Sequence, residues 1–285
     1  MSDDAPYRPI TPLMEAVLLE DAEEGCRWAK ELLESGEDPN AVDPMNGRTP
    51  LFMAWWNERD DQIKLLLKHG ASADIEIGGF DEVMIGNAPI ETSLLIFEAG
   101  FSFKSFLGTN QLGETVCDGG TNPLTYLLEH ERWEHIEAFR PYGVMCLLDA
   151  YDSLGLSPLA EMARDGHLKQ ARWLISQGAD VNAHCEGMIG DTALDKAVHE
   201  KHLDMIKLLL SAGANPNIPT WMWITATDRV SNYGPMKRKA RHDPDKDADL
   251  IEIKGLVLDA ARRFPPPTYP NGTTPEVWPP DPKEK

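Results

Sequence analysis

The apolar positions of this chain recur with the spacing of amphipathic helices. Between residues 203 and 210, the apolar positions 203, 206, 209 and 210 fall on one face of a helix with about 3.6 residues per turn. A glycine follows each of five such stretches, at positions 36, 70, 100, 178 and 213. Because glycine readily adopts the left-handed conformation that ends a helix, each of these glycines predicts a helix C-terminus.

Two segments of the chain are nearly the same sequence. Residues 157–182 and 192–217 both open with Ser or Thr, continue through two apolar-striped stretches, and close on Gly-Ala-Asp/Asn, and each landmark is displaced by 35 positions. Ser or Thr before Pro or Ala suits a helix N-cap with proline in the first turn. A fixed period of this length predicts a solenoid of stacked helix pairs, which cannot bury their apolar faces alone.

The same landmarks occur nearer the N-terminus. Residues 49–54 read Thr-Pro-Leu-Phe-Met-Ala and lead to a leucine run and Gly70-Ala71, and residues 11–16 read Thr-Pro-Leu-Met-Glu-Ala and lead to Gly36. These residues resemble the ankyrin repeat. The resemblance implies two antiparallel helices in each unit, with Thr-Pro-Leu opening the first helix and the leucine run in the second. The Gly-Ala-Asp turn then leads into a projecting β-hairpin finger.

Other units depart from this pattern. Residues 122–128 open a unit whose second helix, 133–139, should stop early at Pro141. Around 80–103 only a second helix, Ile90 to Gly100, is recognisable. We therefore expect an all-α solenoid of stacked ankyrin-like helix-turn-helix repeats with β-hairpin fingers and modified caps. It forms one domain over 1–264 and is followed by a proline-rich tail over 265–285. The expected units are about 8–42, 43–78, 79–105, 113–150, 151–185, 186–218 and a cap over 219–264.

Three irregular segments leave alternatives open. Residues 101–120 resemble an enlarged finger loop, and Gly119-Gly120 lies there without any complete phosphate-binding motif. The cap should have a first helix near residues 221–228, a loop over 231–247 and a second helix over 248–264. The loop holds a basic cluster at 237–242, which fits a solvated loop better than a nuclear address or a phosphate site. The tail fits an extended segment against the last repeat better than a proline-motif ligand.

Charge narrows the classes of partner. The chain has 47 acidic and 27 basic residues, a formal net charge of −20. Such a field disfavours nucleic acid and anionic membranes and favours a protein partner with a basic surface, although acidity also serves solubility alone. The N-terminus lacks the apolar region of a secretory signal, and no run is long enough to span a membrane, so we expect a cytoplasmic protein that is monomeric when free. Four widely spaced cysteines suggest free thiols in a reducing compartment.

Catalytic chemistry is not indicated. His199 and His202 are three residues apart, whereas a His-Glu-x-x-His zinc helix needs four, and they flank the expected turn between two helices. No serine or cysteine stands in a recognisable nucleophile motif. We expect no catalytic residues, no metal and no cofactor. The alternative to a protein-binding function is a ligand-binding or enzymatic role that involves the 101–120 loop.

The resemblance implies that a partner binds at the finger tips and at the ends of the first helices. By register, the finger positions are Asp43, Asn46, Glu76, Asp81, Asp118, Asp152, Glu186 and Asp191. The first-helix positions are Phe52, Trp55, Trp56, Asn57, Tyr126, Glu129, Arg164, Asp165, His199 and Glu200. Adjacent tryptophans cannot both face the same helix interface, so at least one of Trp55 and Trp56 should be exposed or fill the gap beside the degenerate third unit.

These observations favour a non-enzymatic protein-binding module. The sharper hypothesis is a bacterial immunity protein that binds and neutralises a cognate basic toxin in the cytoplasm, since an acidic body complements the positive surface of a nuclease-like toxin. The same features suit a general ankyrin scaffold, a regulatory adaptor, or an effector that binds host proteins. An adjacent toxin gene would discriminate among them.

Overall fold

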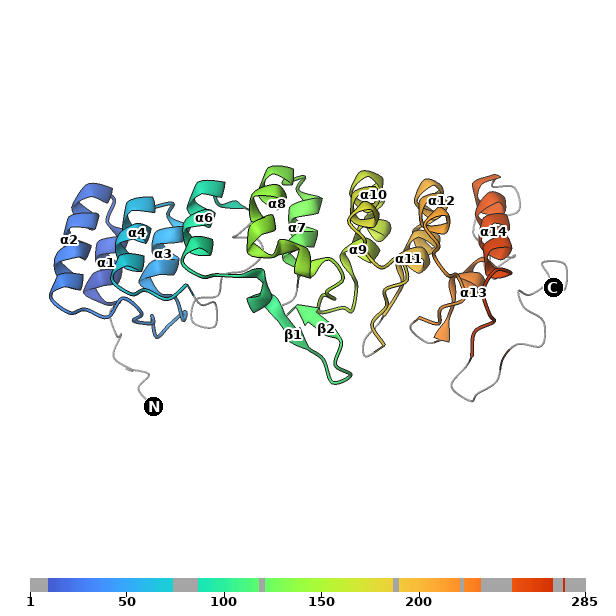
Figure 1. Cartoon of the computed structure of the whole chain (residues 1–285), viewed down its shortest axis with the longest axis horizontal. Coiled ribbons are helices and arrows are strands. Elements are labelled where there is room, and N and C mark those ends of the chain that lie inside the picture. The colour runs from blue at the N-terminus through green and yellow to red at the C-terminus, as the bar shows by residue number, and fades with distance from the viewer. Residues whose placement is uncertain are drawn as a thin grey trace, which may run out of the picture. The chain divides into compact units, whose positions relative to one another are not determined.

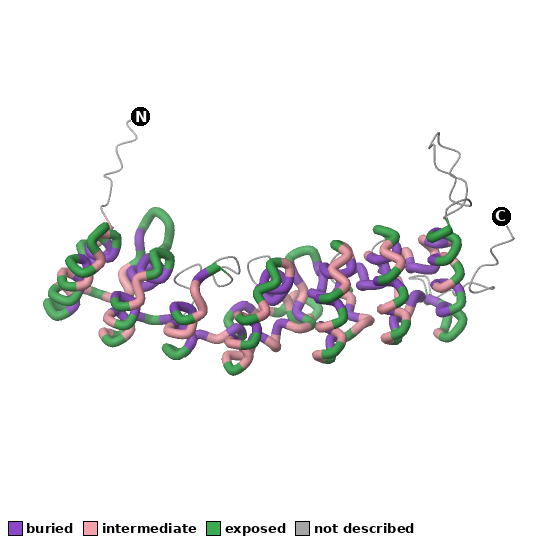
Figure 2. The backbone as a smooth tube through the Cα atoms, turned by 90° about the horizontal axis from the view of Figure 1, so that it is seen from above, coloured by how far each residue is buried: buried purple, intermediate pink, exposed green. Residues whose placement is uncertain are grey.

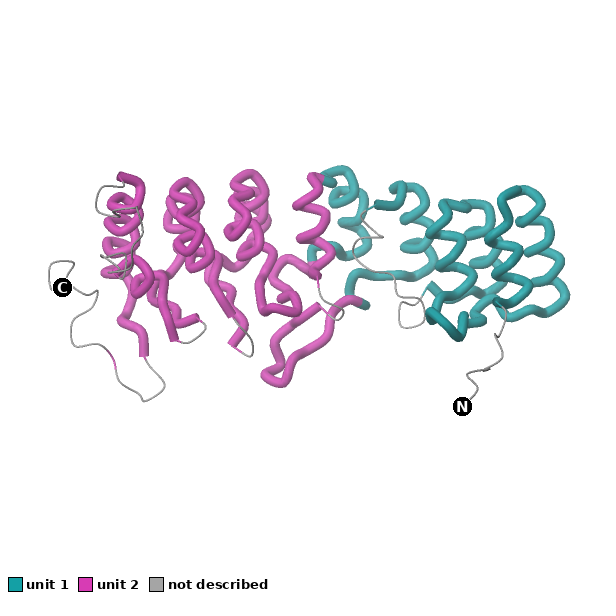
Figure 3. The backbone as a smooth tube through the Cα atoms, turned by 180° about the vertical axis from the view of Figure 1, so that it is seen from behind, with its two compact units in different colours: residues 1–105, 132–145 teal, residues 106–131, 146–285 magenta. Residues whose placement is uncertain are grey.

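The computed structural model describes residues 10–73, 87–117, 121–186, 190–220, 223–231, 248–268 and 274. The chain divides into two compact units (Figure 3). Unit 1 comprises residues 1–105 and 132–145, and unit 2 comprises residues 106–131 and 146–285. No described helix is long and apolar enough to cross a membrane.

Unit 1 is built from paired helices (Figure 1). In it, α1 packs on α2, α3 packs on α4, and α1 and α2 pack in turn on α3 and α4. Its helices are α1 (Pro12–Leu18), α2 (Ala22–Glu34), α3 (Pro50–Trp56), α4 (Asp60–Lys68), α6 (Ile90–Glu98), α8 (Trp133–Phe139) and the 3-10 helix η3 (Arg140–Tyr142). The hydroxyls of Thr11 and Thr49 cap α1 and α3 by accepting from the backbone N–H of Met14 and Phe52, so the predicted N-caps are confirmed.

An aromatic cluster supports the second helices α6 and α8 of unit 1. Phe97 of α6 lies with its ring centroid 4.8 Å from that of Phe139 of α8, 5.1 Å from Phe101 and Phe103, and 4.9 Å from Tyr142. Pairs at such separations contribute beyond their area burial. The expected second helices over 90–100 and 133–139 are confirmed, and η3 follows α8 at Pro141.

Unit 2 repeats the helix pair along its length. The first helices α9, α11 and α13 pack in sequence, as do the second helices α10, α12 and α14, and α7 packs on α9. Buried and exposed positions alternate along the second helices α10, α12 and α14, whereas α7 is buried from Pro123 to Leu128 (Figure 2). The bounds are α7 (Pro123–Glu129), α9 (Pro158–Asp165), α10 (Leu168–Ser176), α11 (Ala193–Glu200), α12 (Leu203–Ser211), α13 (Ala226–Ser231) and α14 (Ala248–Ala261). The 3-10 helices η2 (Phe103–Phe106) and η4 (Val144–Leu147) contain points where the chain passes from one unit to the other.

The enlarged finger is a β-hairpin. Strand β1 (Leu107–Thr109) pairs antiparallel with β2 (Thr115–Cys117), with Leu107 opposite Cys117. At the turn, the Glu114 carboxylate accepts from the backbone N–H of Glu186 at 2.9 Å, which ties the hairpin to the next finger. Among the described residues these are the only strands, so the other described fingers are turns rather than the hairpins expected from the resemblance.

The helix ends follow the sequence pattern closely. Gly36, Gly70, Gly100, Gly178 and Gly213 all have φ between 90° and 111°, as predicted. Two asparagines bond the turn of the next repeat: Asn40 donates to the carbonyl of Gly70 at 3.0 Å, and Asn182 donates to that of Gly213 at 3.3 Å. The main chain is therefore ordered from one repeat to the next by side-chain amides.

The C-terminal cap differs from the expectation in its first helix. The helix begins at Ala226 rather than near residue 221, because the backbone turns at Trp223 (φ 61°) and the Thr220 hydroxyl donates to the carbonyl of Ile224. Thr225 then caps the helix with the Asp228 carboxylate. The α13 helix ends at Ser231, and residues 232–247, where the loop and its basic cluster are expected, and most of the tail lie outside the described residues.

Candidate functional site

The first helices carry different side chains at the same position in the two units. Seven residues after each N-cap, unit 1 has Leu18 and Trp56, which are 46% and 56% exposed. The equivalent positions of unit 2 are Glu129, Arg164 and His199, on α7, α9 and α11. Among the described first helices, this position is therefore apolar in unit 1 and polar in unit 2.

The adjacent tryptophans of α3 point to different environments. Trp55 is 2% exposed and packs near Phe52, whereas Trp56 is exposed and stacks on the Phe52 ring with centroids 6.5 Å apart and planes at 7°. The Arg48 guanidinium lies 4.9 Å from the centroid of the same Phe52 ring. The expectation that at least one of the pair is exposed is confirmed, and Trp55 is a core residue.

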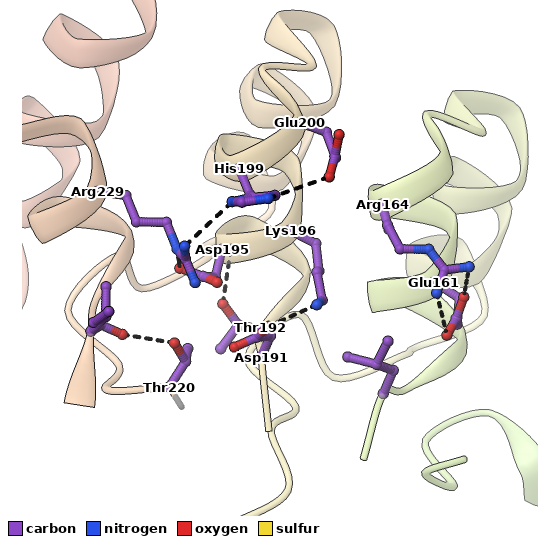
Figure 4. Close-up of polar contacts among 12 residues, drawn as sticks. Glu161, Arg164, Asp191, Thr192, Asp195, Lys196, His199, Glu200, Thr220 and Arg229 are labelled. Atoms are coloured by element: carbon purple, nitrogen blue, oxygen red, sulfur yellow. Dashed lines mark hydrogen bonds and ion pairs between the residues drawn. The ribbon is translucent and has the colours of Figure 1, made fainter. Parts of the chain in front are cut away.

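A carboxylate–arginine network lies on α7 and α9 of unit 2. Arg164 forms an ion pair with the 6%-exposed Glu161 and donates two hydrogen bonds of 2.8 Å to the two carboxylate oxygens of Asp165. Glu129 of α7 joins them, since oxygens of Glu129, Glu161 and Asp165 all lie within 4.8 Å of one another. Figure 4 shows Arg164 against Glu161.

Burial and crowding alter the ionisation of this network. Desolvation, opposed by Arg164 and helped by a hydrogen bond with Asp152, raises the pKa of Glu161 to about 7. Desolvation and the Asp165 charge raise the pKa of Glu129. The hydrogen bonds from Arg164 lower the pKa of Asp165. Near neutral pH, the network can therefore hold or release one proton at Glu161.

A second network joins α11 to the C-terminal cap. Asp195, 1% exposed, accepts a hydrogen bond of 2.5 Å from Arg229 of α13, and His199 lies 3.4 Å from the same guanidinium (Figure 4). Lys196 pairs with Asp191 at 2.7 Å. Desolvation raises the pKa of Asp195, and the Arg229 hydrogen bond opposes that shift. The contacts of Arg229 bind α13 to α11, whereas the Lys196–Asp191 pair lies within one repeat.

The structure separates the proposed partner-binding residues into three groups. Nine are exposed or half-buried: Asn46, Trp56, Asn57, Glu129, Arg164, Asp165, Glu186, His199 and Glu200. Six are buried: Asp43, Phe52, Trp55, Tyr126, Asp152 and Asp191. Glu76, Asp81 and Asp118 lie outside the described residues.

The buried group serves the fold, so we correct the expectation that these side chains meet a partner directly. Asp43 accepts from the backbone N–H of Met45 at 2.9 Å, and Asp152 accepts from Leu154 and Leu156 at 2.8 Å each. Each aspartate thereby shapes its own finger turn. The apolar members are core side chains, because the inner surface of a short first helix is covered by its neighbours.

Sequence reasoning missed several residues of these faces. Leu18 was not selected, although it occupies the register of Trp56, and comparing the first helices position by position would have found it. Glu161 and Lys196 stand four residues after their N-caps, and each pairs within its own repeat, with Arg164 and Asp191. The role of Arg229 could not be predicted from a local sequence pattern, because its partner Asp195 is 34 positions away.

The carboxylate cluster is the only group of three or more potential ligands in the described chain. Carboxylate oxygens suit hard cations such as Ca²⁺. Here the guanidinium of Arg164 already bonds Glu161 and Asp165, and it competes with a cation for the same oxygens. Nε2 of His202 donates to the carbonyl of Arg164 and Nε2 of His135 donates to that of Ala88, both at 3.1 Å, so these histidines link repeats.

A polar groove of about 820 Å³ lies on the second helices of unit 1. It runs between α2 and α4, and its lining includes Cys26, Arg59 and Gln62. Gln62 is 1% exposed, and its equivalent in α10, Gln170, donates to the carbonyl of Leu128 in the preceding repeat. Gln62 occupies the same position, but neither its amide nitrogen nor its amide oxygen has a hydrogen-bond partner among the described residues.

Family models of ankyrin repeats match two parts of the chain. A model described as "Ankyrin repeats (3 copies)" matches residues 135–220, and one described as "Ankyrin repeats (many copies)" matches residues 27–67. The chain therefore contains ankyrin repeats over both of these stretches. Ankyrin repeats are generally protein-interaction modules rather than enzymes, which agrees with the class expected from the sequence.

Similar proteins support the repeat fold over most of the chain. The human "SH3 and multiple ankyrin repeat domains protein 2" is 24% identical over 83% of this chain and 12% of its own length. A "Putative ankyrin repeat-containing protein" of Treponema pallidum is 32% identical over 50% of this chain and 43% of its own length. The ankyrin repeat domain of Bcl-3 superposes with a TM-score of 0.62 at 20% identity, covering 86% of this chain and 97% of that domain.

Two of the relatives are much longer than this chain. The chain spans 12% of the human relative and 9% of the ankyrin repeat domain-containing protein SAT10 of Stachybotrys chartarum. What those longer proteins do as a whole does not transfer with the repeats. The likeness to the Bcl-3 domain establishes the fold.

Proposed function

We propose that this protein inhibits a basic protein partner, as an immunity protein that binds and neutralises a toxin in the cytoplasm. The observation that carries the proposal is the excess negative charge on an interaction fold. The formal net charge is −20, and residues 10–73 hold 13 acidic and six basic residues. Such a surface accelerates association with a basic protein and mimics the phosphates that a nuclease-like toxin binds.

The proposal gives the chain no catalytic role of its own. Its charged groups in unit 2 are bonded to one another: Arg164 to Glu161 and Asp165, Lys196 to Asp191, and Arg229 to Asp195. Of these pairs, only Arg229–Asp195 joins two helices, and the others lie within one repeat. In this proposal the free protein is a monomer that binds one partner, without nucleic acid, membrane or cofactor.

The alternative function is a scaffold or adaptor, or an effector that binds host proteins. The observation that favours it is the great length of the human and Stachybotrys relatives, of which this chain matches 12% and 9%. Repeats of this kind occur there within much larger proteins. Under this alternative the chain would bind several partners with modest affinity rather than one basic partner tightly.

Affinity purification of the full tagged chain from its native host tests the proposal. We expect one basic protein in stoichiometric amount, released as NaCl is raised because the attraction is screened. Expression of that partner alone should arrest growth, and co-expression with the chain should restore it. Capture of several non-basic proteins, or a partner that is harmless when expressed alone, would contradict the immunity proposal and favour a scaffold.

A further inference from the structure

We infer that unit 1 binds its partner on an α1–α3 face that accepts a bulky apolar side chain flanked by lysines or arginines. The α1–α3 face consists of Leu18 and Trp56 together with the exposed carboxylates Glu15, Glu20 and Glu58. This inference rests on the proposed function, and adds to it the place of contact and the chemistry of the contacting segment.

Leu18 and Trp56 belong to one surface. Each stands seven residues after its N-cap, on helices that pack against each other. The ends of these helices are tied together, because Arg59, which follows α3, lies 3.4 Å from the carbonyl oxygens of Leu19 and Glu20, which follow α1. Two large apolar side chains, 46% and 56% exposed, are thereby held at neighbouring points of the face.

The exposed Trp56 ring lies beside a buried aromatic side chain. It is nearly parallel to the ring of the buried Phe52, and Asn57 donates to the carbonyl of Met53 at 2.7 Å, which closes the end of α3. Tryptophan is among the residues that most often dominate binding energy at interfaces.

The carboxylates around the two apolar side chains are available to a cationic partner. Within the described chain, Glu15, Glu20 and Glu58 form no ion pair, while the neighbouring Arg59 donates to main-chain carbonyls. Charge complementarity therefore favours lysine or arginine beside the apolar anchor. An acidic or purely apolar segment would leave three like charges unmatched.

The described first-helix positions of unit 2 lack this combination at the same register. The equivalent positions hold Glu129, Arg164 and His199; Arg164 is paired with Asp165, and His199 lies 3.7 Å from Glu200. A partner would have to replace existing pairs there, which gains little net free energy. The apolar anchor site thus belongs to unit 1.

A random peptide library displayed on phage and selected on the immobilised full chain tests this inference. We expect enrichment of peptides with one bulky apolar residue flanked by lysine or arginine. Synthetic copies should bind Trp56→Ala roughly tenfold or more weakly, as for loss of an interface anchor. Trp223→Ala is the matched control, because Trp223 is 51% exposed on unit 2, and it should bind as the unaltered chain does.

A second variant separates charge from anchor. Glu15→Lys/Glu20→Lys/Glu58→Lys changes only exposed side chains, so it should keep the circular dichroism spectrum while weakening the same peptides. Selected peptides that are acidic, that lack an apolar anchor, or that bind Trp56→Ala as well as the original chain would overturn the inference, as would a selection yielding no binders. A basic partner captured from the host but bound equally by Trp56→Ala would refute this face and leave the proposed function standing.

Discussion

Individual side chains at equivalent positions perform different tasks along the repeats. Four residues after the N-cap, Lys196 bonds Asp191, whereas Glu161 is an acid that bonds Arg164 and shares a hydrogen bond with Asp152. The Glu161 side chain is also buried, with 6% of its surface exposed. A buried carboxylate crowded by other acids is a source of pH-dependent stability.

We predict that Glu161→Gln changes how stability depends on pH. The folded pKa of Glu161, about 7, lies above its ordinary value of 4.5, so the folded state binds more protons between these values. The contribution of Glu161 is therefore complete below pH 4.5 and is lost as pH rises to 7. Relative to the unaltered chain, Glu161→Gln should gain about 2 kcal/mol in free energy of unfolding between pH 5 and pH 8.

Urea unfolding at the two pH values measures this difference. Glu200→Gln serves as control, because Glu200 is exposed at the end of α11. Parallel pH profiles for the unaltered chain and Glu161→Gln would show that Glu161 titrates in the folded protein as it does in the unfolded one.

The two tryptophans of α3 should differ sharply in their contribution to stability. Trp55→Ala removes a side chain that is 2% exposed and should lower the free energy of unfolding by about 3–5 kcal/mol, since it leaves a cavity. Trp56→Ala should cost less than about 1 kcal/mol, because much of that ring is already in water. Denaturant titration of both variants checks the order, and equal losses would contradict the assignment of Trp55 to the core and Trp56 to the surface.

At the scale of helices, the distance between two packed helices decides whether a position in their contact can hold a residue larger than glycine. Gly25 lies inside α2, and a Cβ there would come within 2.5 Å of the carbonyl oxygen of Ala16 in α1. Gly255 lies inside α14, and a Cβ there would meet nothing within 4 Å. The same residue type therefore permits helix packing at one position and only weakens the helix at the other.

We predict opposite effects for Gly25→Ala and Gly255→Ala. Alanine favours a helix over glycine by about 0.5–1 kcal/mol, so Gly255→Ala should raise the midpoint of thermal unfolding. Gly25→Ala should lower it, because α1 and α2 must move apart. Each variant is the control for the other in one set of melting curves, and stabilisation by both would refute the tight contact at Gly25.

The elements were largely predictable, and the contacts across repeats were not. Thr11, Thr49 and the five left-handed glycines mark helix ends by local chemistry, so the sequence located most helices. The start of α13 was missed because Thr225 and Asp228 form its cap, whereas the sequence pattern placed the helix five residues earlier.

For the site, exposure of one tryptophan followed from helix geometry. The burial of Asp43 and Asp152 depends on finger turns, which the repeat register alone does not describe.

For the whole molecule, the negative field acts on stability as well as on binding. A net charge of −20 on 285 residues repels itself in the folded state more than in the expanded unfolded chain. The acids are not balanced locally, since residues 1–40 contain 11 acidic and three basic residues. The folded chain is thus sensitive to ionic strength.

We predict that added NaCl stabilises this protein. Raising the salt from about 0.01 M to 0.15 M shortens the screening length from about 30 Å to about 8 Å, which weakens the repulsion among the carboxylates. The midpoint of thermal unfolding at pH 7.5 should rise over this range. It should rise less at pH 5, where part of the negative charge is neutralised. A midpoint that falls with salt would mean that the ion pairs of unit 2 outweigh the repulsion.

The asparagine joints have a consequence for how such a protein changes over generations. Asn40 donates to the carbonyl of Gly70 and accepts from the N–H of Ser72, while Asn182 does the same with Gly213 and Asn215. All four partners are main-chain atoms, which every amino acid except proline provides. A joint of this kind places no demand on the side chains of the repeat it holds. Substitutions can therefore change the exposed side chains of one repeat, for example from tryptophan to arginine, without altering the hydrogen bonds that join that repeat to the next.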